Sequence, residues 1–298
     1  MTLKIVVLVK QVPDTKRIIA DAMKEDGTVN RQALPAIFNP EDLNALELAL
    51  SIKDRRETEV IVLTMGPPAA ASVLRDTLFR GADKVFLITD RKFAGADTLA
   101  TSYTLMKAIE KVCPHFDIIV CGRQAIDGDT AQVGPQTAEK LKVPQVSYVE
   151  TVEKIEVGHL VIKRLIQDGA EWVRSKMPVL LTVIDSANEP RPPRARLIMK
   201  YKYASCELEL DDLLYKFPEF QDRDQLRNYL IKKNIYIPII TANDMDVDPA
   251  RIGLNGSPTK VKKIDRVVLA GGALKFFENT DQSLQDMIHE LVEDYIIS

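Results

Sequence analysis

Cysteine and histidine are scarce in this chain, with three of each in 298 residues. Cys113, Cys121 and Cys206 include no CxxC pair and cannot form a disulfide framework, which favours a reducing cytoplasm. The histidines are scattered, so no spacing predicts a metal site. No apolar run reaches the ~20 residues that cross a bilayer, and the N-terminus is a poor secretory signal. We therefore expect a cytoplasmic protein with no membrane span and no metal.

Several common functional motifs are also missing. The sequence contains no GxxxxGK[ST] phosphate loop, no GxGxxG after a strand and no GxSxG elbow. The 40 Lys and Arg against 43 Asp and Glu give a net charge of −3, which argues against nucleic-acid binding. Because no acid–base or nucleophile set is recognisable, any chemistry is expected to belong to a bound cofactor, and no residue is predicted to be catalytic.

Strand and helix patterns alternate through the first part of the chain. Four short, apolar, β-branched runs predict buried strands, namely Lys4–Lys10, Glu59–Met65, Lys84–Thr89 and Phe116–Cys121. Helical patterns separate them, with Asn39 as the expected N-cap of a helix that Pro40 opens, and Gly81 at the end of another. This order predicts a doubly wound, mainly parallel α/β sheet whose ligands bind beyond the carboxyl ends of its strands.

The pattern changes after about Val146. Shorter strands are expected to form a short antiparallel addition to the sheet, and these are Val146–Glu150, His159–Ile166, Glu171–Arg174 and Val179–Ile184. Three prolines and three arginines between residues 188 and 196 predict an exposed basic loop. The rest is expected to be irregular, except for a final helix over Ser283–Ile297. We expect one domain over residues 1–205, followed by a C-terminal insertion and extended arm over residues 206–298 that packs on the sheet or on another subunit.

The segment Gly122–Gly134 (GRQAIDGDTAQVG) is the strongest candidate for ligand binding. It leaves a predicted strand, carries three glycines and leads into a helix, an arrangement that presents backbone N–H groups to a phosphate. Thr130 and Gln132 add side-chain donors. Asp127 and Asp129 would repel a phosphate unless they point away and cap backbone groups in the turn. The alternative is an ordinary long loop.

Two other features have equally simple structural explanations. In Gly95–Thr101 (GADTLAT), Asp97 is a natural helix cap and Thr98 and Thr101 lie on the first turns, so capping explains the segment as well as ligand contact does. The same holds for Asn39-Pro40. The basic stretch Pro190–Lys202 is either a site for an acidic partner or a solvated loop.

A set of segments resembles the β subunit of electron-transfer flavoproteins, in the order of that family and over about residues 1–202. They are Val9–Asp14 (VKQVPD), Asn39-Pro40, Thr64–Pro67 (TMGP), Gly81-Ala82-Asp83, Gly122–Gly134, and Asn188–Arg191 (NEPR) followed by Ile198-Met199-Lys200. The resemblance implies a fold related to adenine-nucleotide hydrolases and a larger α subunit that holds an FAD. Gly95–Ser102 (GADTLATS), Gly122–Gly134 and Gly256-Ser257-Pro258-Thr259 most resemble the electron-bifurcating class.

In that class the β-subunit site holds a second FAD that NADH reduces, whereas in the ordinary class it holds AMP. The resemblance therefore implies that a hydride from NADH is split, with one electron passing to the α-subunit FAD and on to a higher-potential acceptor. The second electron passes to ferredoxin or flavodoxin. The resemblance also implies an acyl-CoA dehydrogenase-like or other redox partner, but it does not identify the high-potential acceptor. The chain is then a subunit of an NADH-dependent oxidoreductase complex and not an enzyme alone. Two alternatives stay open: a non-bifurcating β subunit with structural AMP, and a nucleotide-hydrolysing or ATP-binding protein of the same superfamily.

The resemblance also implies which residues contact the cofactor. For the ADP portion they are Leu8, Asn39, Pro40, Asp42, Met65, Gly122, Gln124, Ala125, Asp127, Gly128, Thr130, Ala131, Gln132, Val133 and Gly134. Asp97, Thr98 and Thr101 are expected near the flavin. For partner recognition, which falls near residues 188–202, they are Arg191, Arg194, Ala195, Arg196 and Leu197. Ala195 falls near the position of an anchoring leucine in relatives, with Leu197 as its substitute.

Overall fold

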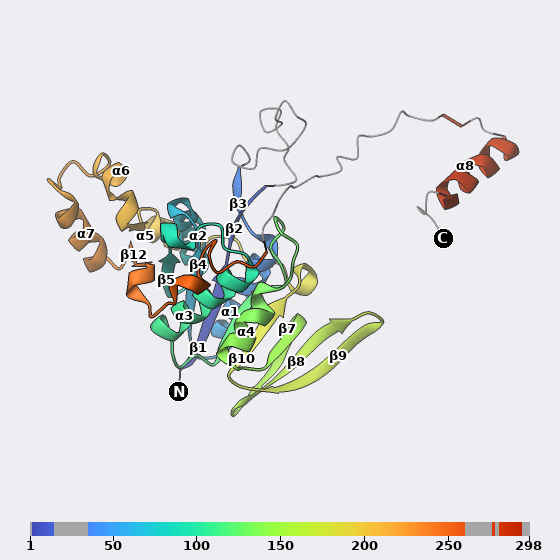
Figure 1. Ribbon diagram of the computed structural model, residues 1–298, viewed down its shortest axis with the longest axis horizontal. Helices are drawn as coiled ribbons and strands as arrows, with labels where there is room; N and C mark the ends of the chain where they lie inside the picture. The colour runs from blue at the N-terminus through green and yellow to red at the C-terminus, as the bar shows by residue number, and fades with distance from the viewer. Residues whose placement is uncertain (1, 15–34, 260–275, 278–279, 294–298) are drawn as a thin grey trace. The chain divides into compact units, whose positions relative to one another are not determined.

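The computed structural model describes residues 2–14, 35–259, 276–277 and 280–293 (Figure 1). The chain divides into two compact units, Met1–Lys260 and Val261–Ser298. In the second unit the described helix is α8 (Asp281–Glu293), which agrees with the predicted C-terminal helix. Residues 294–297 of that prediction lie outside the described residues. The packing of residues 206–298 on another subunit stays a prediction.

The first unit is built on a sheet that has nine strands in the described residues, in the order β13-β5-β4-β1-β6-β10-β7-β8-β9. The four predicted buried strands are confirmed as β1 (Leu3–Val9), β4 (Thr58–Met65), β5 (Lys84–Ile88) and β6 (Ile118–Gly122), and they pair in parallel. The chain moves outward from β1 through β4 to β5 and then returns to the other side of β1 as β6. This reversal of direction places a crevice between the carboxyl ends of β1 and β6.

Helices cover both faces of the sheet. Alternate side chains of β1 enter two hydrophobic clusters, because successive side chains of a strand point to opposite faces. Ile5 and Val7 belong to the cluster that contains residues of α1 (Pro40–Arg55) and α2 (Ala71–Arg80). Val6 and Leu8 belong to the cluster that contains residues of α3 (Thr98–Val112) and α4 (Val133–Leu141). The doubly wound α/β architecture is thus confirmed.

The antiparallel addition consists of β7 (Gln145–Glu156), β8 (His159–Ile166) and β9 (Gly169–Lys176). These strands form a curved ribbon at one end of the sheet (Figure 1). The expectation that Val179–Ile184 belongs to this addition is wrong. Strand β10 (Val179–Val183) lies between β6 and β7 and is parallel to both, and all five of its residues are buried. A strand buried on both faces reads as a continuous apolar run, which does not reveal its direction.

The expectation that the chain is irregular after residue 205 is also wrong. The described elements there include β11 (Ser205–Cys206), α6 (Leu210–Leu214), α7 (Arg223–Lys232), β12 (Tyr236–Ile237) and β13 (Ile239–Ile240). Leu210, Leu226 and Leu230 are fully buried in the same cluster as α1 and α2. Strand β13 extends the central sheet through its pairing with β5. Near the N-terminus, β2 (Gln11–Pro13) pairs with β3 (Ala36–Phe38).

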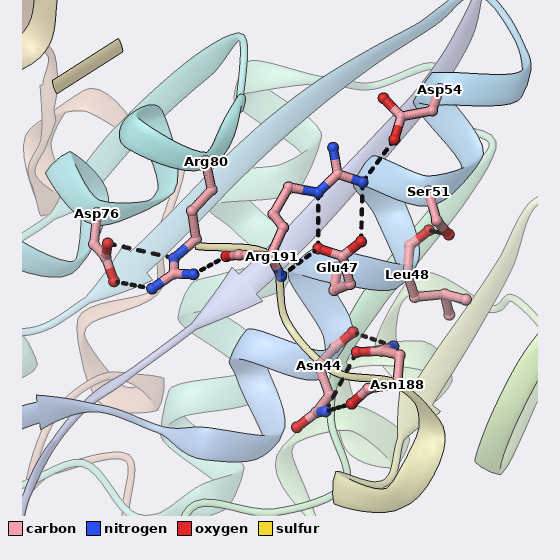
Figure 2. A network of polar contacts seen from close by, with 9 residues as sticks. All are labelled: Asn44, Glu47, Leu48, Ser51, Asp54, Asp76, Arg80, Asn188 and Arg191. Atoms are coloured by element: carbon pink, nitrogen blue, oxygen red, sulfur yellow. Dashed lines mark hydrogen bonds and ion pairs between the residues drawn. The ribbon is translucent and has the colours of Figure 1, made fainter. Parts of the chain in front are cut away.

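The segment that follows β10 is fastened to α1 by polar contacts (Figure 2). The guanidinium of Arg191 lies between two acidic side chains of α1, with Nε 2.8 Å from Glu47 Oε2 and Nη2 2.7 Å from Asp54 Oδ2. Asn44 Nδ2 donates to the carbonyl of Asn188 at 2.7 Å. Arg80 of α2 donates to the carbonyl of Arg191. The predicted exposed loop is therefore held to the body of the protein at its first residues and continues into α5 (Ala195–Tyr201).

Replacement of Arg191 by Met should lower the free energy of unfolding by about 1–3 kcal/mol, because Glu47 loses its partner while it stays largely buried. Chemical denaturation of both proteins measures the difference. Arg194→Met is the matched control, since Arg194 is exposed and its loss should change stability by less than ~0.5 kcal/mol. Equal effects of the two substitutions would contradict the fastening role of Arg191.

Candidate functional site

A cleft of about 640 Å³ lies at the carboxyl ends of β1, β4, β5 and β6 and is lined by residues that end or follow each of these strands. Neighbouring strands are ~4.8 Å apart, so four strand ends extend over roughly 14 Å. The sequence predicts the site at this edge of the sheet. Its lining includes Leu8, Met65, Ile88 and the run Cys121–Ala125, each from a different strand or the loop that follows it.

The N-terminus of α1 holds the loop that follows β6. Asn39 is fully buried, and its side chain bonds to two backbone groups of that loop, with Nδ2 2.9 Å from the Gln124 carbonyl and Oδ1 3.1 Å from the Ile126 amide. The prediction that Asn39 caps α1 with its side chain is therefore wrong. The loop after β6 lies so close to Asn39 that its backbone carbonyl and amide groups occupy both the donor and the acceptor of the Asn39 side chain.

Glu41 and Asp42, in the first turn of α1, extend this hold. Glu41 accepts from the Gln124 amide at 2.9 Å and pairs with Arg123 at 2.8 Å. Asp42 is buried, and its two oxygens accept the amides of Gly122 and Lys10, each at 2.9 Å. Burial raises the pKa of Asp42 to about 7, although both amide hydrogen bonds act in the opposite direction. One helix end thus fixes the loops after β1 and β6.

Gly122 and Gly134 allow this close packing. A Cβ atom at Gly122 would lie 2.6 Å from Asp42 Oδ1, and one at Gly134 would lie 2.8 Å from Thr182 Cγ2. Both distances are shorter than carbon and oxygen atoms tolerate, so only glycine fits either position without displacement of a neighbour. Gly122 and Gly134 therefore let the backbone approach α1 and β10, respectively.

The acidic residues of the loop do not face the cleft. Asp127 pairs with Lys10 at 2.8 Å, and Asp129 accepts from Gln124 Nε2 at 3.2 Å, and neither lines the cleft. Their partners are side chains, so the prediction that they cap backbone groups is wrong. Asp129 and Ala131 have positive φ angles of 48° and 52°.

The amides of Thr130, Ala131 and Gln132, which line the cleft, make no hydrogen bond to another described residue. The first amides of α4 likewise have no acceptor within the helix. Arg123 Nε is also buried without a partner among the described residues. Among the described residues, this wall therefore has three unpaired amides and no unpaired carboxylate, an arrangement that suits a phosphate.

A second wall of the cleft is formed by the segment that precedes α3. Asp97 caps α3, as predicted, through bonds from the amides of Leu99 and Ala100 to Oδ1. Its other oxygen accepts from Thr259 Oγ1 at 2.6 Å, and its own amide donates to Ser257 Oγ at 2.8 Å. Residues of the Gly256–Thr259 stretch therefore hold this wall in place. Thr98 Oγ1 donates to Gln132 Oε1 at 2.9 Å, and this bond connects the segment at the start of α3 to the segment that precedes α4.

Most of the residues implied as cofactor contacts meet in the cleft. Those that line it are Leu8, Asp42, Met65, Asp97, Thr98, Thr101, Gly122, Gln124, Ala125, Gly128, Thr130, Ala131, Gln132, Val133 and Gly134. Asn39, Pro40 and Asp127 do not line it, and Asn39 acts through the loop that it holds. Sequence reasoning did not name Lys10, Arg91 and Arg123, which also line the cleft. Each of these residues lies at or just after the end of a predicted strand, and this position is the feature of the sequence that could have identified it as a site residue.

The thiol of Cys121, which lines the cleft, is not a reactive group. Cys121 lines the cleft near the end of β6 but is buried, and burial raises the pKa of its thiol far above the ordinary value. The thiol is therefore protonated and a poor nucleophile at neutral pH. Among the described residues that line the cleft, we find no nucleophile with an adjacent base.

The residues implied in partner recognition do not share one environment. Arg194, Ala195 and Arg196 are exposed. Arg191 is paired with Glu47 and Asp54, so its guanidinium already has internal partners. Leu197 packs against the hydrophobic cluster of α1 and α2, whereas Met199 of the same helix is 66% exposed.

Within the parts of the chain that the structure describes, no helix combines the length and apolarity that crossing a bilayer requires. The model of the electron transfer flavoprotein domain family matches residues 26–205. Over 99% of the chain, 41% of residues are identical to an electron transfer flavoprotein subunit beta of Thermoanaerobacterium thermosaccharolyticum, all of which is covered. This chain belongs to the electron transfer flavoprotein family.

Other full-length relatives of this β-subunit family are named for the complexes in which they work. The chain is 40% identical to the caffeyl-CoA reductase-Etf complex subunit CarD of Acetobacterium woodii and 39% identical to the acryloyl-CoA reductase electron transfer subunit gamma of Anaerotignum propionicum. Each match covers 99% of this chain and all of the relative. The resemblance predicted over residues 1–202 thus extends over nearly the whole chain.

Gly122→Ala should destabilise the protein by roughly 1–3 kcal/mol, because its Cβ would overlap Asp42 Oδ1 and the backbone of Glu41. Chemical denaturation measures this loss. Gly128→Ala is the control, since a Cβ there meets no atom within 4 Å, and its unfolding free energy should change by less than ~0.5 kcal/mol. A Gly122→Ala protein as stable as the wild type would show that the loop packs less closely on α1.

The raised pKa of Asp42 predicts a pH-dependent stability. Between pH 3.8, the ordinary pKa of an aspartate, and about pH 7, the folded protein holds a proton at Asp42 that the unfolded chain has released. The contribution of Asp42 to the free energy of unfolding therefore falls as pH rises through this window and is constant above it. The difference in unfolding free energy between the wild type and Asp42→Asn should fall accordingly from pH 4 to pH 7. A difference that rises with pH would contradict the prediction.

Proposed function

We propose that this protein is the β subunit of an electron-bifurcating electron transfer flavoprotein and that its cleft holds FAD. When bound, FAD would accept a hydride from NADH and pass single electrons to the α-subunit flavin and to ferredoxin or flavodoxin. The part of this chain is to bind and orient that cofactor. No residue of the chain is assigned a catalytic role, and a cytoplasmic location is part of the proposal.

The unpartnered amides of Thr130, Ala131 and Gln132 are the observation that carries the nucleotide assignment. They lie at the N-terminal end of α4, where the helix dipole stabilises negative charge. Arg123 adds a positive charge, held beside the cleft by Glu41. These residues would hold the diphosphate, because the acidic side chains of the loop are taken up by Lys10 and Gln124.

The extent of the cleft favours a dinucleotide cofactor over AMP. Beyond the phosphate wall, the lining continues past Met65 and Ile88 to Phe93 and the N-terminus of α3. Leu105 and Phe93 give this part an apolar surface for a ring system. Thr98 and Thr101 provide hydroxyl groups there. A ligand that filled only the part of the cleft next to the phosphate wall would leave the apolar end of this volume of about 640 Å³ empty.

The relatives support the choice of partners. One is named as a subunit of a caffeyl-CoA reductase-Etf complex and another as the electron transfer subunit of an acryloyl-CoA reductase. We therefore propose an α subunit and an acyl-CoA dehydrogenase-like reductase, or another redox protein, as partners of this chain. Within residues 188–202, the exposed residues Arg194, Ala195 and Arg196 would contact the reductase.

Co-purification of the chain with its α subunit, followed by denaturation and identification of the released cofactors, tests the proposal. Two FAD per αβ pair are expected, because in this proposal the cleft holds a second flavin in addition to that of the α subunit. One FAD and one AMP would contradict the proposal and favour a non-bifurcating β subunit. Release of neither from this chain, with turnover of ATP, would favour a nucleotide-hydrolysing or ATP-binding protein of the same superfamily.

A further inference from the structure

A second hollow, of about 310 Å³, adjoins the wall that carries Asp97. Gly95–Thr98 line the cleft, and the next residue, Leu99, lines the hollow. Ser257, also in its lining, accepts the amide hydrogen of Asp97 at 2.8 Å. The two spaces are therefore separated by one short segment, and a ligand that reaches around this segment could occupy both.

Two basic side chains from different parts of the chain line this hollow. Lys140 lies in the last turn of α4, and Arg251 ends the short 3-10 turn Pro249–Arg251. The Arg251 guanidinium lies over the Tyr103 ring, 4.0 Å from its centroid, which fixes the position of its charge. Tyr103 is in turn held by the Asp248 amide, which donates to its hydroxyl at 3.0 Å.

Neither cation has a carboxylate partner: the ion pairs among the described residues include neither Lys140 nor Arg251. Burial and the nearby charge of Arg251 lower the pKa of Lys140, and they outweigh the opposite effects of Asp97 and Glu139. The Asp97 carboxylate is already occupied by the amides of α3 and by Thr259. An anion between the two cations would remove an unfavourable interaction that the protein does not compensate itself.

The turn that carries Arg251 is closely packed. A Cβ at Gly256 would lie 2.1 Å from the carbonyl carbon of Arg251, and Gly253 has a φ of 55° and lies against the Lys92 carbonyl. These two glycines let the chain fold back on itself, which places Arg251 and Ser257 on the same hollow. The position of Arg251 beside the hollow is thus set by backbone geometry.

We propose that this hollow binds a phosphate group of the dinucleotide that reduces the cofactor in the cleft. The proposal rests on the proposed function, since it assigns part of the electron donor to Lys140 and Arg251. The hollow is at the small end of the range for ligand pockets, which suits a phosphate with its sugar and not a whole nucleotide. The reactive ring of the donor would then lie on the cleft side of Gly95–Leu99, towards Thr98 and Thr101.

The test uses the complete αβ complex and calorimetric titration with NAD⁺, which binds without reducing the cofactor. Lys140→Gln and Arg251→Gln should each weaken NAD⁺ binding by about tenfold, the expected loss of one charge-assisted hydrogen bond. Lys140→Arg should keep the affinity within about threefold, because the charge is retained. Lys111→Gln, which removes an exposed lysine of α3 outside the hollow, is the control and should bind as the wild type does.

Cofactor content separates failure of this inference from failure of the proposed function. If the wild-type complex holds two FAD and binds NAD⁺, but the two Gln variants bind it equally well, the hollow does not take the donor and the inference is overturned. Inorganic phosphate is the second probe. If the variants lose phosphate binding but keep NAD⁺ affinity, the hollow takes a free anion and the dinucleotide assignment is overturned. One FAD and one AMP in the wild type would overturn the proposed function itself.

Steady-state NADH oxidation gives an independent readout. A positioning role for the phosphate predicts a raised KM in Lys140→Gln and Arg251→Gln with kcat nearly unchanged, because the binding interaction is the same in the ground and transition states. A fall in kcat with an unchanged KM would contradict a role in binding the donor.

Discussion

The hold of the α1 N-terminus on the loop after β6 is the interaction on which the site depends. Asn39, Glu41 and Asp42 bond to the backbone of residues 122–126. These acceptors and donors take up the start of the loop, while the amides of Thr130, Ala131 and Gln132 are left for a ligand. Without this division the loop could satisfy its own amides, and the cleft would lose these unpaired donors.

The same helix connects the cleft to the segment that follows β10. Asn39 precedes its first turn, which carries Asp42, and its later turns carry Glu47 and Asp54, which pair with Arg191. Asn44, between these groups, bonds to Asn188. A single helix therefore positions both the wall of the cleft that follows β6 and the start of the segment that follows β10. The separation between them is consequently set by the length of α1 and not by a flexible loop.

Sequence reasoning succeeded where the signal was local. The four central strands followed from apolar, β-branched runs, Gly81 from its place after a helix (its φ is 124°), and the Asp97 cap from a carboxylate before a helical pattern. It failed where a distant segment decides the structure. Asn39 reads as an N-cap, but the loop at Gln124, 85 residues away, takes its side chain. The direction of β10 depends on its neighbours β6 and β7, and the edge strand β13 is two residues long, too short for any pattern.

A structure of the αβ complex with its native cofactors tests the central claim most directly. The account predicts a diphosphate within hydrogen-bond distance of the amides of Thr130–Gln132, with Asn39 still bonded to the loop. A cleft closed by side chains, or a nucleotide whose phosphates lie away from these amides, would contradict it.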